Sequence, residues 1–90
     1  MRFEFDSAKS RQVKRQHGVS LTKAQEIFDQ VYLVDHKQDD PEQYRAIGWC
    51  RGSLHSVIFE TRHDSEGEYL HLITAWKATK EEENSYAENT

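Results

Sequence analysis

The 90-residue sequence has one cysteine, one proline and no long hydrophobic run. Its single thiol, Cys50, excludes an internal disulfide, a paired-cysteine zinc site and a dithiol redox pair, so we interpret it as a small buried hydrophobe rather than a reactive nucleophile. No stretch approaches the ~18 apolar residues of a membrane helix, and the opening Met1-Arg2-Phe3-Glu4 is not the apolar run of a signal peptide. The length and these absences predict one domain over residues 1–90, in the cytoplasm and without membrane contact.

Charge is plentiful but unevenly distributed. The 12 Lys and Arg residues and 16 Asp and Glu residues give a net charge of -4. Six basic and two acidic residues lie between Arg2 and Lys23, whereas eight acidic and three basic residues lie between Glu60 and the end. The net charge argues against nonspecific wrapping of nucleic acid, but the asymmetry predicts a basic surface for phosphates and an acidic surface for a basic partner. Solvated helix faces are the alternative interpretation of the same charges.

Local patterns predict an α+β fold with helices on one face of an antiparallel sheet. A short strand over residues 1–5 precedes a helix over residues 7–16, with Asp6 as N-cap and Gly18 as C-cap. A second helix begins near Ser20, with a capping box from Thr22 to Gln25. An antiparallel β-meander of about four strands follows, at Val31–Asp35, Tyr44–Cys50, Leu54–Arg62 and Glu68–Trp76.

Polar segments separate these strands, and a short helix follows the last one. Thr79 and Glu82 in capping-box spacing predict a helix from Lys80 toward Tyr86, with fraying beyond it. The expected connections are a polar loop at His36–Glu42, a tight turn at Arg51–Ser53 and a long polar turn at His63–Gly67.

The search for catalytic motifs is mostly negative. The sequence contains no glycine-rich phosphate loop and no nucleophile elbow. Of five histidines, only His55 and His71 fall in expected strands, and a zinc site there needs a third ligand from a carboxylate or Cys50. We therefore predict no metal and no other cofactor.

The last predicted strand puts a histidine on an open sheet face. Alternation places Leu70, Leu72, Thr74 and Trp76 on the core and His71 opposite them. Metal-free RNA cleavage needs a base for the 2′-hydroxyl, cations for the crowded phosphorus and an acid for the 5′-oxygen. Histidine suits the first and third tasks and arginine the second. Nearby strands offer Tyr44 or Arg45, His55 and Arg62, although alternation alone does not place them on one face.

Short motifs in a fixed order resemble one known family. They are FEFDSAK at the start, HGVS followed by A-x-x-I-F, Ile47-Gly48, Glu60-Thr61-Arg62, and ITAWKAT with a downstream Glu and Tyr. From Phe3 to Tyr86 this order resembles the BrnT toxins of bacterial type II toxin–antitoxin systems. The resemblance implies a RelE-like ribonuclease fold, RNA cleavage that inhibits translation, and a cognate ribbon-helix-helix antitoxin of the BrnA type, with an antitoxin-mediated heterotetramer as one assembly.

The resemblance and the strand pattern together give the candidate site residues. The catalytic candidates are His71 for proton transfer and Arg62 and Lys77 for phosphate contact. The RNA-binding candidates are Lys9, His17, Arg45 and His55. Among them Lys9 matches the lysine after the D-x-A opening, His17-Gly18 the helix break, Arg62 an arginine at a strand end and Lys77 the ARKAT-like motif, and Glu42 matches an acidic loop position. For His17, capping of the helix C-terminus is the alternative role.

The chain departs from the family at three positions, His71, Trp76 and Gln43, where the family commonly has arginine. One strong donor contributes about 2.7–4 kcal/mol to transition-state stabilisation, so these losses predict a weakened toxin, unless His71 supplies a general acid or base in place of a cation. A catalytically silent module that keeps the toxin fold and binds an antitoxin-like partner is the alternative function. A DNA-binding regulator is disfavoured because no helix combines a basic recognition face with a dimer seam.

Overall fold

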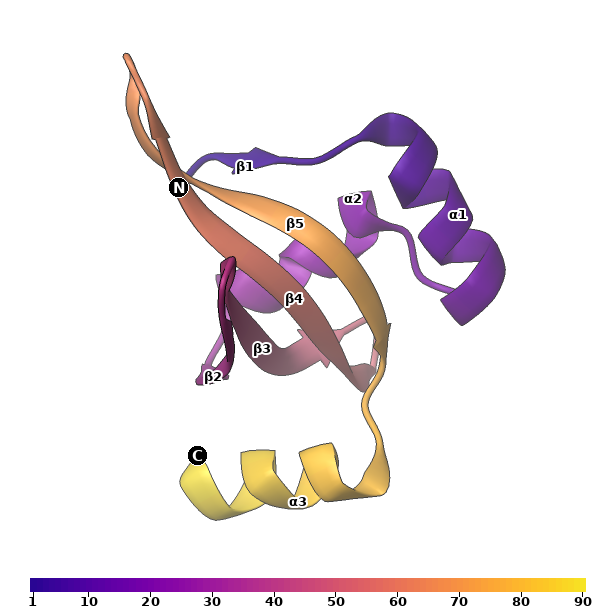
Figure 1. The fold of residues 1–90 in the computed structure, drawn as a ribbon. Helices are drawn as coiled ribbons and strands as arrows, with labels where there is room; N and C mark the ends of the chain where they lie inside the picture. Colours follow the sequence, from indigo (N-terminus) through magenta and orange to yellow (C-terminus); the bar gives the residue numbers. More distant parts are fainter.

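The computed structural model describes all 90 residues and shows five strands in one sheet, ordered β1-β5-β4-β3-β2 (Figure 1). β1 runs parallel to β5, and the remaining neighbours are antiparallel, so the α+β prediction is confirmed for a mixed sheet. The elements in chain order are β1 (Phe3–Glu4), α1 (Ser7–His17), α2 (Leu21–Ala24), the 3₁₀ helix η1 (Gln25–Asp29), β2 (Tyr32–Asp39), β3 (Glu42–Cys50), β4 (Ser53–Asp64), β5 (Gly67–Lys77) and α3 (Lys80–Asn89).

Helix α1 begins and ends where its caps predict. The Asp6 side chain accepts a hydrogen bond from the Lys9 backbone N–H at 2.9 Å. Gly18 has φ of 80°, a left-handed conformation that glycine adopts without steric cost, and its N–H closes the helix on the Lys14 carbonyl at 2.9 Å. Val13 and Ser10 are buried, and most of the remaining residues of this polar helix are exposed.

The second helix is shorter than expected. Ser20 caps α2 through the Lys23 N–H at 3.1 Å, so the predicted capping box from Thr22 to Gln25 is wrong. After Ala24 the chain tightens into η1, which packs directly on β3. A Cβ atom at Gly48 would lie 3.1 Å from Cβ of Ile27, so this close approach requires glycine in the strand.

Two predicted loops are strands. β2 continues to Asp39, and β4 and β5 continue until only Ser65 and Glu66 join them, so the polar loop at His36–Glu42 and the long turn at His63–Gly67 were wrong. These hairpin ends extend past the core and are exposed to water on both faces, so they do not show the alternation of apolar residues that marks a half-buried strand. Cross-strand hydrogen bonds determine their structure.

A register shift in the β4–β5 pair changes which side chains are buried. Ile58 lies opposite Thr74, whereas Phe59 lies opposite Leu72, so β5 contains one extra residue, Ile73. Leu70 and Leu72 are buried as predicted and His71 lies on the opposite face. After the bulge, the residues of β5 that face the core are the odd-numbered ones rather than the even-numbered ones. Ala75 is fully buried, and the prediction that Thr74 and Trp76 face the core is therefore wrong.

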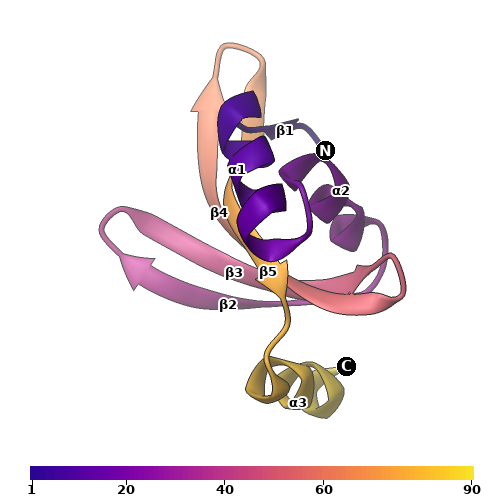
Figure 2. The same ribbon diagram turned by 90° about the vertical axis from the view of Figure 1, so that its right-hand side faces the viewer.

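The sheet has an inner face, covered by α1, α2 and η1, and an outer face. The inner face contributes to a core cluster of 12 buried residues that includes Val57, Leu72 and Ala75. The outer face buries Ile47 and Ile58 outside that cluster. α3 lies apart from α1 and α2 (Figures 1 and 2) and packs on the outer face, where Glu82 binds Arg45 and Trp76, so the prediction that helices occupy one face only is wrong.

Two sequence interpretations concern single residues and helix length. Cys50 is 2% exposed, its Sγ donates to the Lys23 carbonyl at 3.3 Å, and burial raises the pKa of its thiol, which fits a structural role. No helix is long and apolar enough to cross a membrane. The RelE-like relationship implied by the resemblance stays a prediction.

Candidate functional site

The outer face is open at the end away from α3, and polar side chains gather there. Glu60 on β4 lies opposite His71 on β5, and Arg62 lies opposite Tyr69, so strand alternation puts all four on the same face. Gln43 on β3 reaches Glu60 across the next strand boundary. We call these five residues the His71 cluster.

Hydrogen bonds fix the arginine of this cluster. The Glu60 carboxylate accepts from Gln43 Nε2 at 2.9 Å and from Arg62 Nε and Nη2 at 2.9 and 2.6 Å. The bonds from Gln43 and then Arg62 hold the pKa of Glu60 below its usual range. Nε and Nη2 both bind one carboxylate oxygen, and the Arg62 side chain stays 44% exposed, so its remaining donors can bind an anion.

His71 lies half-buried between two strands that both carry a carboxylate opposite it. Its register partners are Glu60 on β4 and Glu4 on β1. Burial and then the Arg62 charge lower the pKa of His71, and the two carboxylates oppose this shift. The ring is therefore neutral at pH 7, which is the protonation state of a general base.

An arginine from the first residues of the chain borders the cluster. The Arg2 guanidinium carbon lies 4.5 Å from the centre of the Tyr69 ring, within the range of cation–π attraction. Arg2 also pairs with Asp64 at 2.8 Å and Glu66 at 2.7 Å, in the turn region of the β4–β5 hairpin. The aromatic ring is thus flanked by Arg2 and Arg62.

The structure brings together two of the three catalytic candidates. His71 and Arg62 lie together on the open half of the outer face. Lys77 lies at the other end of β5, opposite His55, and its side chain is on the other face of the sheet. His55 Nδ1 lies 3.0 Å from the Ser53 carbonyl, which can only accept, so Nδ1 carries the proton and Nε2 is the free nitrogen.

The remaining candidates are dispersed. Lys9 and His17 belong to α1, near opposite ends of that helix, and the His17 ring lies 6.5 Å from the Trp76 ring. Arg45 is on the outer face under α3, where its guanidinium binds Asp35 and Glu82. Its donors are thus directed at carboxylates of the protein itself.

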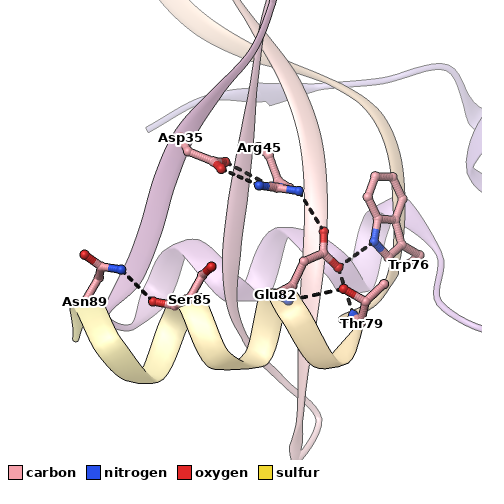
Figure 3. A network of polar contacts seen from close by, with 7 residues as sticks. All are labelled: Asp35, Arg45, Trp76, Thr79, Glu82, Ser85 and Asn89. Carbon is pink, nitrogen blue, oxygen red and sulfur yellow. Dashed lines mark hydrogen bonds and ion pairs between the residues drawn. The ribbon is translucent and has the colours of Figure 1, made fainter.

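Glu82 anchors α3 to the sheet through this network (Figure 3). Its Oε1 accepts from the Trp76 indole N–H at 2.9 Å and the Thr79 N–H at 2.8 Å, and its Oε2 accepts from Arg45 at 3.2 Å. Burial alone would raise the pKa of Glu82, but these hydrogen bonds and the Arg45 charge outweigh burial and lower it. The predicted capping box of Thr79 and Glu82 is present, and the helix continues past Tyr86 to Asn89.

The three departures from the family now have positions. Trp76 is part of the anchor under α3, Gln43 binds Glu60, and His71 lies beside Arg62. Sequence reasoning missed the role of Glu60, although its spacing of two residues from Arg62 within one strand was a usable signal. Among the titratable side chains, no group of three or more His, Cys, Asp or Glu residues is placed to hold a metal ion.

Comparison with known proteins identifies the family. No curated protein matches the chain. The family model described as the ribonuclease toxin BrnT of type II toxin–antitoxin systems matches residues 5–82, which is most of the 90 residues. The chain therefore belongs to the BrnT family of ribonuclease toxins of type II toxin–antitoxin systems.

Proposed function

We propose that this toxin is a metal-independent endoribonuclease whose reaction takes place at the His71 cluster. The observation that carries this proposal is the placement of His71 next to the carboxylate-oriented Arg62 on an uncovered sheet face, and a lowered pKa of His71 fits the role of a base. RNA contains its own nucleophile, the 2′-hydroxyl, so a base and a cation at this position supply two of the three groups that cleavage needs.

His71 takes the proton of the 2′-hydroxyl as the 2′-oxygen forms its bond to phosphorus. Arg62 stabilises the negative charge that builds on the non-bridging oxygens, because its planar donors match two of them. As the bond from phosphorus to the 5′-oxygen breaks, that oxygen takes a proton from the hydroxyl of Tyr69, which lies opposite Arg62 in the β4–β5 pair. The products are a 2′,3′-cyclic phosphate and a 5′-hydroxyl, and solvent then takes the extra proton from His71 and supplies one to Tyr69.

Lys77 and His55 take a different part in this proposal. Because they lie opposite each other at the far end of the β4–β5 pair, they bind RNA away from the reacting phosphate. Lys9 and His17, on α1, act in the same way. Arg45 stays in the anchor of α3.

A type II toxin implies an antitoxin, and we propose a BrnA-like ribbon-helix-helix protein that assembles with the toxin as a heterotetramer in the cytoplasm, where messenger RNA is translated. Charge supports this partner. α3 carries Glu81, Glu83 and Glu88 and has only one basic residue, Lys80, so its solvent side favours a basic surface.

The test is cleavage of RNA by the purified chain in the presence of a chelator. We expect the wild type to cleave, and His71→Ala to reduce the rate by about 10²–10⁴-fold, the usual contribution of a general base. The matched control is His63→Ala, an exposed histidine on the same hairpin whose ring lies 3.4 Å from Glu68. Cleavage that requires a divalent ion would contradict the mechanism.

The same variants separate the toxin from a catalytically silent module. Induced expression of the wild type should arrest growth, and Arg62→Ala with His71→Ala should restore it. If the folded wild type binds a co-expressed antitoxin but neither cleaves RNA nor slows growth, the chain is the silent module.

A further inference from the structure

Positive charge on the helical side of the molecule has no local compensation. Residues 7–25 contain five Lys and Arg residues and no Asp or Glu, although the whole chain has a net charge of -4. None of the five takes part in an ion pair, whereas Arg2, Arg45, Arg51 and Arg62 each bind a carboxylate. The five cations are Lys9, Arg11, Lys14, Arg15 and Lys23.

Three of these cations line a groove between α1 and the start of α2. Arg11, Lys14 and Arg15 are spaced by three and four residues, so they lie on one side of α1, and Val13 holds the opposite side in the core. The groove has a volume of about 470 Å³, and Phe5 is its one hydrophobic lining residue. Its other lining residues are hydroxyl-bearing: Ser7, Ser10, Ser20 and Thr22.

A second groove, of about 280 Å³, neighbours the first, and Lys14 lines both. Lys23, Arg51 and His55 also line this groove. Arg51 is held by a bidentate contact to Glu26, at 3.1 and 2.9 Å, but Glu26 does not line this groove. No carboxylate lines either half.

We propose that these two halves together, here called the basic groove, bind the phosphate backbone of an RNA strand. The inference rests on the proposed function for the identity of the nucleic acid. Cations and hydroxyls make most protein contacts to phosphates. Three hydrophobic residues line the groove, Phe5 in the first half and Val19 and Cys50 in the second, and only one of them is aromatic, whereas the core of a protein–protein interface is rich in aromatic residues and poor in lysine. The chemistry therefore favours a nucleic-acid backbone over a protein segment.

The basic groove is connected to the His71 cluster around the β1 edge of the sheet. Glu4 of β1 is a register partner of His71, and Phe5 and Ser7, which follow it in the chain, line the groove. An RNA strand that crosses this short edge can contact the basic groove while one of its phosphates lies at Arg62. The groove thus supplies affinity at a distance from the chemistry.

The experiment measures binding of the full chain to a fluorescein-labelled single-stranded RNA by anisotropy, with His71→Ala present throughout to keep the RNA intact. Arg11→Ala with Arg15→Ala should weaken binding by about tenfold and lower the slope of log K against log salt by about 1.4, at about 0.7 per phosphate contact. The matched control removes two exposed lysines elsewhere, Lys37→Ala with Lys80→Ala, and should change the affinity by less than about twofold. Circular dichroism establishes that both variants fold.

Equal weakening by the two double variants would overturn the proposal, because general electrostatics would then explain it. A polyglutamate peptide that competes with RNA as tightly, and whose binding depends on Arg11 and Arg15, would overturn it in favour of an acidic protein partner. Failure of the catalytic proposal looks different: the wild type would cleave no RNA, while RNA binding would still depend on Arg11 and Arg15 and so support the basic groove.

Discussion

The two halves of the outer sheet face use the same pairing of arginine and glutamate for different ends. Under α3, Arg45 is 25% exposed and binds two carboxylates, one of them from Glu82, which is 7% exposed. At the open end Arg62 is 44% exposed and binds a single oxygen of Glu60. The first arginine has its charge neutralised inside the protein, whereas the second is oriented by its partner and still presents donors to water.

Both residues are arginines, so residue type does not distinguish their roles. Arg45 is structural because α3 covers it, and Arg62 is a functional candidate because no helix covers it. Removing one partner of a buried ion pair destabilises the protein strongly, because the other charge stays buried without compensation. An exposed pair contributes little to stability because water and salt screen it. Variants that break each pair should therefore affect different properties of the toxin.

Between these two arginine–glutamate pairs, the largest effect on the cleavage rate is expected for Arg62→Ala. Loss of the phosphate donor should lower the cleavage rate by about 10²–10³-fold, the usual cost of one strong transition-state donor. The free energy of unfolding should change by less than about 1 kcal/mol, because Arg62 is 44% exposed and Gln43 still donates to Glu60, whose side chain is 13% exposed. Single-turnover cleavage and urea denaturation measure the two quantities, and Arg62→Lys should retain part of the rate. A large loss of stability with an unchanged rate would reverse the assignment.

The next effect is expected for Glu82→Ala. Trp76, Thr79 and Arg45 each lose an acceptor, and unsatisfied buried donors cost about 1–3 kcal/mol each, so we expect unfolding to become easier by about 3–5 kcal/mol. Urea denaturation measures this change. Glu81→Ala removes the same charge from an exposed position of the same helix turn and serves as the control. Equal effects of the two variants would show that Glu82 acts only through helix charge.

A smaller effect is expected for Thr79→Ala. This change removes the hydroxyl that caps the Glu82 N–H at 3.2 Å but leaves the Glu82 carboxylate and its contacts in place. Loss of an N-cap costs about 1 kcal/mol, less than loss of the anchor itself. Thermal unfolding followed by circular dichroism checks the value, with Ser85→Ala within α3 for comparison. A loss as large as that of Glu82→Ala would mean that the cap alone holds α3.

The smallest effect concerns pH. The pKa of His71 is lowered from its ordinary value of 6.5 in the folded chain, so the unfolded chain binds more protons just below that pH. Stability from this group is therefore complete above pH 6.5 and is lost as the pH falls through the lowered pKa. The cleavage rate should fall over the same interval as the base becomes protonated. His71→Gln should remove this step from the stability curve, and a step that persists belongs to another group.

The caps of two helices and the family could be predicted from the sequence. Asp6, Gly18 and the Thr79–Glu82 box were each placed correctly, because caps depend on neighbours within one helix turn. His71 was placed on the open face because the alternation around it is local to β5. The family match over residues 5–82 confirms the resemblance that the motifs indicated.

What failed depended on partners distant in the sequence. The bulge at Ile73 moved the Trp76 side chain to the opposite face of the sheet from the one predicted. No local pattern in β5 indicates the extra residue, because the bulge is defined by the register of β5 with β4. The polar hairpin ends were predicted as loops because these parts of the strands bury no side chains and so lack the alternation of apolar residues. Arg45, a candidate for RNA, became part of the anchor of α3 once Asp35 and Glu82 approached it from other elements.

The sequence by itself determined the family, both caps of α1, the start of α3, the basic charge of residues 7–25 and the histidine on an open strand, because these follow from composition and short-range spacing. Only the tertiary structure decided which arginine is enclosed and which is presented, and that Lys77 lies apart from Arg62 and His71. The physical reason is that strand register and the cover of α3 depend on packing between distant segments, and packing sets how much water each charge keeps.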